Sequence, residues 1–123
     1  MKIEVSNGEI IDKLTIIMIK LERITDSLKL ENLRKEYSIL KEAADSIISM
    51  DDPLVKELYS VNNKLWEIED RIRDFERRKE FGNDFIETAR SVYFNNDRRA
   101  LLKREINIRT SSELLEEKSY EKY

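Results

Sequence analysis

Apolar side chains recur along most of the chain at alternating spacings of four and three residues. This spacing places side chains on one face of an α-helix, because a helix has about 3.6 residues per turn. The first such stripe consists of Ile10, Leu14, Ile17, Leu21, Ile24 and Leu28. Similar stripes begin at Leu30 and Leu54, and a fourth apolar region follows residue 84. The pattern predicts an all-α fold in a single domain of residues 1–123.

Capping residues and breaks between the stripes set the limits of each element. Ser6 and Asp52 each precede a stripe and can cap a helix, and Pro53 fits a first helical position. We expect four main helices in antiparallel hairpins and a short C-terminal helix. Their expected ranges are about 7–25, 27–49, 53–81, 84–108 and, for the short helix, 111–119.

The first helix carries apolar side chains outside its main stripe. Ile16 and Ile19 lie near the far side of that stripe, and a helix that is apolar on two sides is buried on two sides. Since one neighbouring hairpin covers only one side, we expect a homo-oligomer, most simply a two-fold dimer with this helix at or near its interface. Long stripes are also typical of coiled-coil packing. The alternative is a compact monomer in which the other three helices surround the first.

Composition narrows the chemistry open to this chain. It has no cysteine, no histidine and only two glycines. These absences exclude classical serine–histidine and cysteine–histidine catalysis, ordinary zinc sites, P-loops and Rossmann fingerprints. A formal net charge of −3 argues against nonspecific nucleic-acid binding. The longest apolar run, 16–19, is too short to span a membrane, and the lack of cysteine favours the cytoplasm.

Acidic pairs spaced three residues apart offer one route to catalysis. Glu42 and Asp45 belong to the second predicted helix, and Glu67 and Asp70 to the third. On facing antiparallel helices, four carboxylates could gather around Mg²⁺, an arrangement similar to that of all-α nucleoside triphosphate pyrophosphatases. This interpretation makes the protein a Mg-dependent nucleotide or sugar-nucleotide hydrolase. The alternative places these residues on solvated helix faces, where they form ordinary ion pairs.

Two further groups of polar residues are candidates for ligand binding. Asn62, Trp66 and Arg73 share one flank of the third helix, where the tryptophan could form the floor of a polar site. The fourth helix is basic and could bind phosphate groups or an acidic partner. Its candidate residues are Arg90, Tyr93, Asn96, Arg98, Arg99, Lys103 and Arg104. Each group also has a structural interpretation. The residues of the third helix would lie at the edge of the core, and the basic fourth helix would pack against the acidic half of the chain.

Asp12 and Lys13 lie beside the apolar stripe of the first helix. Charged side chains are almost never fully buried unless they are paired. These two residues therefore reach solvent at the end of the bundle, or they pair with each other or with a residue such as Arg90 or Asn62. A buried charged network can be a functional site or a device that fixes the packing.

Five blocks of sequence stand out together, at 5–16, 61–70, 89–93, 96–98 and 117–120. They resemble a small bacterial and phage family that is known only as a domain of unknown function. The first block is the most specific. The resemblance implies no mechanism, but it singles out the polar residues within the blocks. These are Asn7, Asp12, Lys13, Asn62, Trp66, Arg90, Tyr93, Asn96 and Asp97.

Together these patterns favour a non-catalytic helical binding or assembly module, without a cofactor, whose partner is a second copy or another protein. One alternative is the Mg-dependent hydrolase. Another is a protein that binds an anionic ligand through its basic fourth helix.

Overall fold

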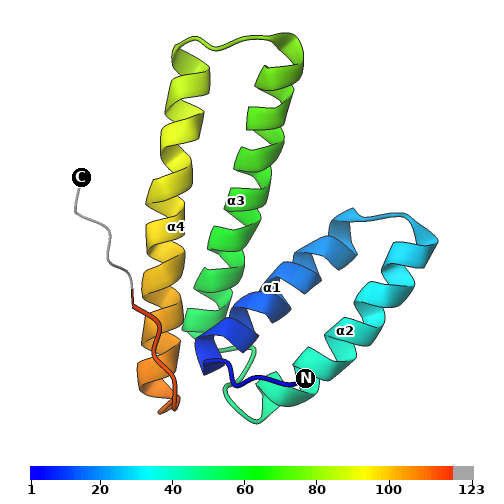
Figure 1. The fold of residues 1–123 in the computed structure, drawn as a ribbon, viewed down its shortest axis with the longest axis vertical. Coiled ribbons are helices and arrows are strands. Elements are labelled where there is room, and N and C mark those ends of the chain that lie inside the picture. The colour runs from blue at the N-terminus through cyan, green and yellow to red at the C-terminus, as the bar shows by residue number, and fades with distance from the viewer. Residues whose placement is uncertain (118–123) are drawn as a thin grey trace.

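The computed structural model describes residues 1–117, and within them the chain forms four α-helices and no strand. They are α1 (Asn7–Arg23), α2 (Ser27–Asp45), α3 (Pro53–Arg78) and α4 (Asn83–Arg109). The predicted all-α fold with four main helices is confirmed. Figure 1 shows a short hairpin, α1–α2, packed beside the lower half of a long hairpin, α3–α4. In this part of the chain no helix is both long enough and apolar enough to cross a membrane.

Three of the four helices begin at a residue whose side chain caps the first turn. Ser6, Asp26 and Asp52 each accept a hydrogen bond from a backbone N–H of the helix that follows. At α3 the cap is followed directly by Pro53, as the sequence predicts. α4 begins one residue earlier than predicted, after Gly82, which has no side chain to form a cap.

The first three predicted helices are too long at their C-termini. They end at 23, 45 and 78 instead of 25, 49 and 81. α3 ends because Lys79 adopts the left-handed conformation, with φ at 56°. The apolar periodicity continues past α2 because Ile47 and Ile48, in the following turn, still pack against the core. At these two residues the apolar periodicity therefore indicates burial and does not indicate a helix.

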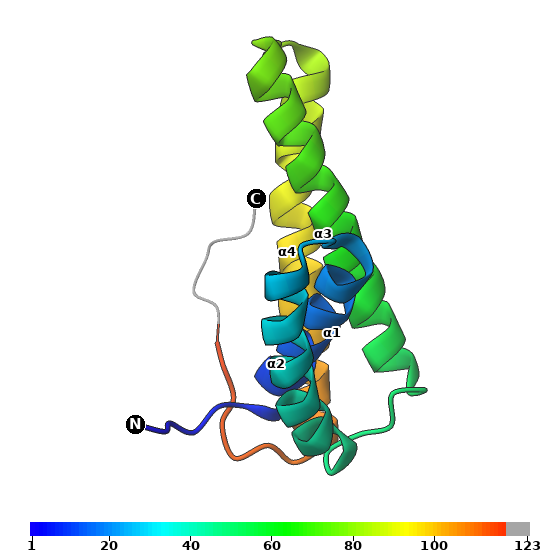
Figure 2. The same ribbon diagram turned by 90° about the vertical axis from the view of Figure 1, so that its right-hand side faces the viewer.

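The predicted short helix at 111–119 is wrong over the residues that the structure describes. Residues 111–117 instead form a turn and an irregular C-terminal tail that runs back along α4 (Figures 1 and 2). The chain reverses because Ser111 is left-handed, with φ at 54°, and the Ser112 N–H donates to the Asn107 carbonyl at 2.8 Å. Positions 118 and 119 lie outside the described residues.

α1 is the centre of the fold. It packs against each of the other three helices, and both views show it between α2 and the α3–α4 hairpin (Figures 1 and 2). Its two apolar sides are thus covered within one chain, and they no longer indicate a dimer interface at this helix. The dimer itself stays a prediction. The central core consists of Ile11, Leu14, Ala44, Leu54, Val55, Leu58, Val61, Leu102 and Ile106.

Candidate functional site

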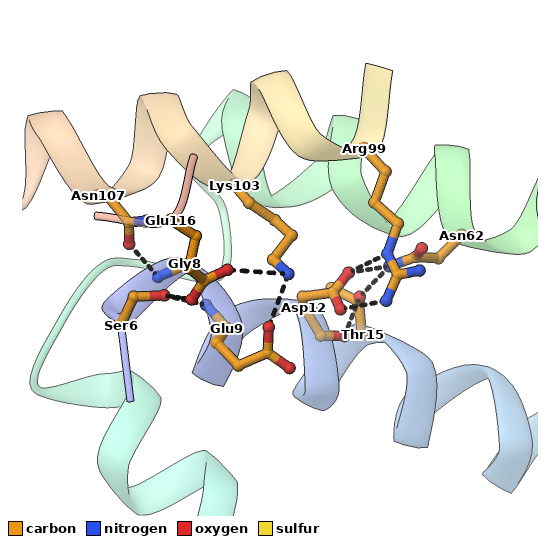
Figure 3. A network of polar contacts seen from close by, with 10 residues as sticks. All are labelled: Ser6, Gly8, Glu9, Asp12, Thr15, Asn62, Arg99, Lys103, Asn107 and Glu116. Atoms are coloured by element: carbon orange, nitrogen blue, oxygen red, sulfur yellow. Dashed lines mark hydrogen bonds and ion pairs between the residues drawn. The ribbon is translucent and has the colours of Figure 1, made fainter. Parts of the chain in front are cut away.

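A carboxylate is completely buried where α1, α3 and α4 meet. Asp12 on α1 accepts two hydrogen bonds from Arg99 on α4, Nε to Oδ1 at 2.8 Å and Nη2 to Oδ2 at 2.5 Å. From α3, the Asn62 Nδ2 donates to the same Oδ1 at 2.9 Å and to the Thr15 hydroxyl at 2.9 Å. We call these four residues the buried ion-pair cluster (Figure 3).

The buried ion-pair cluster satisfies its own polar groups. Moving a carboxylate out of water is costly unless a charged partner and hydrogen bonds replace the lost hydration. The two-pronged contact of the guanidinium does this, and its hydrogen bond with Asp12 raises the pKa of Arg99. Within residues 1–117, every buried polar side-chain atom has a hydrogen-bond partner. The cluster therefore holds three helices in register.

A second polar group joins the start of α1 to α4 and the tail. Lys103 on α4 lies 2.6 Å from a carboxylate oxygen of Glu9 and 3.5 Å from one of Glu116. The buried Ser6 hydroxyl donates to the other Glu116 oxygen at 2.5 Å and accepts from the Glu9 N–H at 3.1 Å. We call these four residues the tail cluster (Figure 3).

Gly8 allows the first turn of α1 to lie against the backbone of α4. Its N–H donates to Asn107 Oδ1 at 2.6 Å, and a Cβ at this position would lie only 2.4 Å from the Lys103 carbonyl oxygen. The preceding Asn7 N–H donates to the Ser112 hydroxyl at 3.0 Å. Most of the first-turn contacts of α1 are thus made with α4 and the residues just after it.

Lys103 lies half-buried between its two carboxylate partners. Burial acts to lower the pKa of its ammonium group, but the hydrogen bond with Glu9 and the charges of Asp12, Glu9 and Glu116 act in the opposite direction. The second set of effects is larger in sum, so the pKa of Lys103 is raised above its ordinary value of 10.5.

This raised pKa predicts a stability contribution that disappears at alkaline pH. A group with a higher pKa in the folded state stabilises the fold fully below its unfolded pKa of 10.5 and stops doing so as pH rises through the folded value. We expect wild-type protein to be more stable than Lys103→Met at neutral pH, and this advantage to shrink above about pH 10.5. Urea unfolding at a series of pH values measures the difference. A constant difference would contradict the prediction.

The structure brings together three of the candidate residues, Asp12, Asn62 and Arg99. Of the alternatives left open for Asp12, which were solvent, Lys13 or a residue such as Asn62 or Arg90, the structure shows burial and pairing with Asn62. The pairing with Arg90 is wrong, since Arg90 is exposed and pairs with Glu87 at 2.8 Å. Nine residues of helix, from Arg90 to Arg99, rotate the side chain by about half a circle. The basic partner therefore comes from the other side of α4.

The remaining candidates lie in separate surroundings. Lys13 is exposed, and Trp66 is half-buried with the Arg23 guanidinium 5.8 Å from its ring. Arg73 is exposed and lies 3.9 Å from Glu69, a pair on the surface of α3. The asparagine of this predicted α3 site is instead turned toward α1. The candidates on the outer part of α4, which are exposed or half-buried, are Tyr93, Asn96 and Asp97.

The four carboxylates considered for Mg²⁺ do not gather. Glu42 and Asp45 lie on α2, Glu67 and Asp70 lie on α3, and α1 separates the two helices (Figure 1). All four are exposed, and Asp45 pairs with Lys41 at 2.6 Å. Within residues 1–117, no group of three or more acidic side chains could hold a metal ion. The convergence that the hydrolase alternative requires does not occur, because α2 packs on α1 and not on α3.

Sequence reasoning placed Arg99 and Lys103 only within a basic helix and did not find their partners. A signal for them exists, because polar residues recur every four positions at Arg99, Lys103 and Asn107, beside the buried Leu102 and Ile106. Such a polar row next to a core stripe indicates contact with another polar row. No comparable signal marks the contacts of the tail.

These features define an all-helical protein in which the first helix is fastened to the last by buried polar contacts. A comparison with protein families matches residues 1–123 to a family of unknown function, DUF6165. The chain belongs to this family, and the resemblance of the sequence blocks to a family of unknown function is confirmed. No curated protein and no solved structure matches the chain.

Proposed function

We propose that this protein is a non-catalytic assembly module of the cytoplasm that pairs with a second copy of itself through α4. The observation that carries the proposal is a second apolar side on that helix. Ile86, the adjacent pair Tyr93 and Phe94, Leu101 and Ile108 are 41–59% exposed. From Ile86 to the pair, from the pair to Leu101 and from Leu101 to Ile108 the spacing is seven or eight residues, which places them on one face. With Arg90 and Asp97, they form what we call the α4 outer face.

The α4 outer face points away from the core of its own chain. Leu102 and Ile106, the buried apolar residues of α4, lie on the opposite side of the helix. A helix that is apolar on two sides is expected to be covered on two sides. α1 is also apolar on two sides, and both of them are covered within the chain, whereas only one side of α4 is.

The charges of the α4 outer face fit an antiparallel copy of the same face. An arrangement with Arg90 opposite the partner subunit's Asp97 also sets Ile86 opposite the partner subunit's Leu101, because each apolar residue lies four positions from the charge. Two-fold symmetry repeats both contacts. Opposite charges that meet in this way fix the register and direction of a helix pair.

The expected dimer is weak. Its axis would pass between Tyr93 and Phe94, whose ring centroids lie 4.7 Å apart within one chain. Side chains that are already about half covered gain roughly 1 kcal/mol each on complete burial, half of the usual value. Four of them from each subunit give about 8 kcal/mol, which is similar in size to the cost of association. The mass is therefore expected to depend on protein concentration.

The polar clusters support a structural role for the rest of the molecule. A general acid or base must exchange its proton near neutral pH, and the chain has no histidine. Asp12 and Lys103, the most buried charged groups of the two clusters, are held by oppositely charged partners. The absence of cysteine from the sequence is typical of proteins in a reducing compartment and supports the cytoplasmic assignment.

The dimer is tested by sedimentation equilibrium over a range of concentrations up to about 500 µM. The apparent mass of wild-type protein is expected to rise from 14.7 kDa toward twice that value as the concentration increases. The double variant Ile86→Lys with Leu101→Lys is expected to stay monomeric. The matched control is Leu28→Lys with Ile39→Lys, which adds the same charges to exposed positions of α2. A wild-type monomer at every concentration, or equal loss in the control, overturns the proposal.

Charge reversal tests the register separately. Arg90→Asp would set an acid against the partner subunit's Asp97 and is expected to weaken the dimer about tenfold or more. Adding Asp97→Arg to this variant restores the opposite charges and is expected to restore the affinity. If the double reversal stays as weak as the single one, the antiparallel register is wrong.

A further inference from the structure

The C-terminal tail covers a cavity beside α4. The cavity has a volume of about 230 Å³, and its lining consists of Ala100, Lys103, Arg104, Asn107, Glu116 and Glu117. Pockets for drug-sized ligands measure about 300–1,000 Å³. A cavity below that range suits a small ion or one charged group of a larger ligand.

Hydrogen-bond donors and cations face the two tail carboxylates, and the two cations, Lys103 and Arg104, line the cavity. The Ser6 hydroxyl and the Lys103 ammonium group both contact Glu116, at 2.5 and 3.5 Å. The Arg104 guanidinium pairs with Glu117. Hydroxyl, ammonium and guanidinium groups together form the donor set that proteins use for carboxylates and phosphates.

Side chains make these contacts with the tail carboxylates. The backbone N–H groups at the start of α1 already donate hydrogen bonds to other groups. Ser6 is only 1% exposed, and its oxygen accepts from the Glu9 N–H, which directs its own proton toward Glu116. The N–H groups of Asn7 and Gly8 donate to side chains of α4 and the tail. The buried hydroxyl is therefore built into the contact with the carboxylate.

Polar contacts hold the two carboxylates of the tail against the start of α1 and against α4. Leu114 and Leu115 are both about half-exposed, so neither side chain is fully buried. The ion pairs of Arg104 with Glu117 and of Lys103 with Glu116 reach the surface, and such pairs contribute little to stability. An anion that enters the cavity can replace the tail carboxylates at low cost.

We propose that this cavity is a binding site for a phosphate group, in which Glu116 and Glu117 stand in for the ligand. A single phosphate group carries more charge than one carboxylate and has more acceptor oxygens. It can therefore replace the tail carboxylates at Lys103 and Arg104, the two cations that line the cavity. Binding displaces the tail from α4, because ligand and tail compete for the same donors. This role goes beyond assembly through the α4 outer face and does not depend on it.

The test is a titration of the ¹⁵N-labelled full chain with inorganic phosphate, with sodium chloride keeping the ionic strength constant. The backbone amide signals of Ser112 and Glu116 report displacement of the tail. Wild-type protein is expected to show weak, saturable binding. Glu116→Gln keeps the size of the side chain and removes the competing charge, so its affinity for phosphate is expected to rise at least about tenfold. Lys103→Gln is expected to lose saturable binding.

Glu113→Gln is the matched control, because it removes the same charge from an exposed position of the same tail. It is expected to keep the wild-type affinity. If Lys103→Gln does not fold, Arg104→Gln, at a more exposed cation, provides the same comparison. Glycerol phosphate distinguishes a phosphate monoester from free phosphate, and tighter binding of either one supports the proposal. Equal affinities for Glu116→Gln and Glu113→Gln, equal shifts with chloride, or tighter binding of acetate overturn it.

Discussion

Replacement of Gly8 by alanine is expected to destabilise the protein by about 2–5 kcal/mol, although alanine is the better helix former. The added Cβ would lie 2.4 Å from the backbone oxygen of Lys103 and 2.9 Å from Asn107 Oδ1. A backbone oxygen within a helix cannot turn aside as the end of a flexible side chain can, so α1 has to move away from α4. That movement also breaks the buried bond from the Gly8 N–H to Asn107.

Gly82→Ala is the matched control for this prediction. Gly82 precedes α4 with φ at −81°, and a Cβ built there meets nothing within 4 Å. Because alanine is a poorer N-cap than glycine, we expect a loss of at most about 1 kcal/mol. Urea unfolding followed by circular dichroism measures both variants. A Gly8→Ala protein as stable as wild type would show that α1 and α4 do not approach as closely as the structure has them.

The helices were predictable from the sequence because their signals are local. Apolar spacing identifies a helix and its buried face, and residues such as Ser6 and Asp52 mark where helices begin. The ends were less predictable, since Ile47 and Ile48 continue the apolar pattern beyond α2 while they pack in a turn. The tail was not predictable, because no local signal marks Ser111 as left-handed and because the contacts of the tail with α1 are tertiary features.

Which side chains pair between two helices depends on how the helices cross. The crossing geometry cannot be read from the sequence. Burial of a charge requires a partner, and this was sufficient to suggest Asn62 for Asp12. The choice between Arg90 and Arg99 required the rotation of α4 against α1. In the same way, the acidic pairs of α2 and α3 had suitable spacing, but α1 lies between them (Figure 1).

The sequence also identified a helix apolar on two sides without showing what covers it. For α1 both covers come from the same chain. For α4 one side is covered in the chain, and the other is the outer face that contains Ile86 and Leu101. Local pattern thus predicts how much surface is buried, whereas packing decides whether a second molecule is needed.

The second large effect is expected at Asp12, where Asp12→Asn should cost about 3–5 kcal/mol. The substitution keeps the shape of the side chain, but it removes the negative charge that balances Arg99. It also brings an NH₂ group among the donors of Arg99 and Asn62, which now contact the carboxylate oxygens at 2.5–2.9 Å. N–H donors that are buried without an acceptor lose their hydrogen bonds to water and form no hydrogen bond in the protein, which destabilises the fold.

Asp45→Asn is the matched control, because Asp45 forms an ion pair with Lys41 at 2.6 Å on the surface of α2. Loss of an exposed pair is expected to cost at most about 1 kcal/mol. A double-mutant cycle with Arg99→Gln isolates the contact itself, and we expect Asp12 and Arg99 to be coupled by about 1–3 kcal/mol. Urea unfolding of the four proteins in the cycle gives this value. If Asp12→Asn costs no more than Asp45→Asn, or the two sites of the cycle are additive, the buried ion pair does not hold α1 to α4.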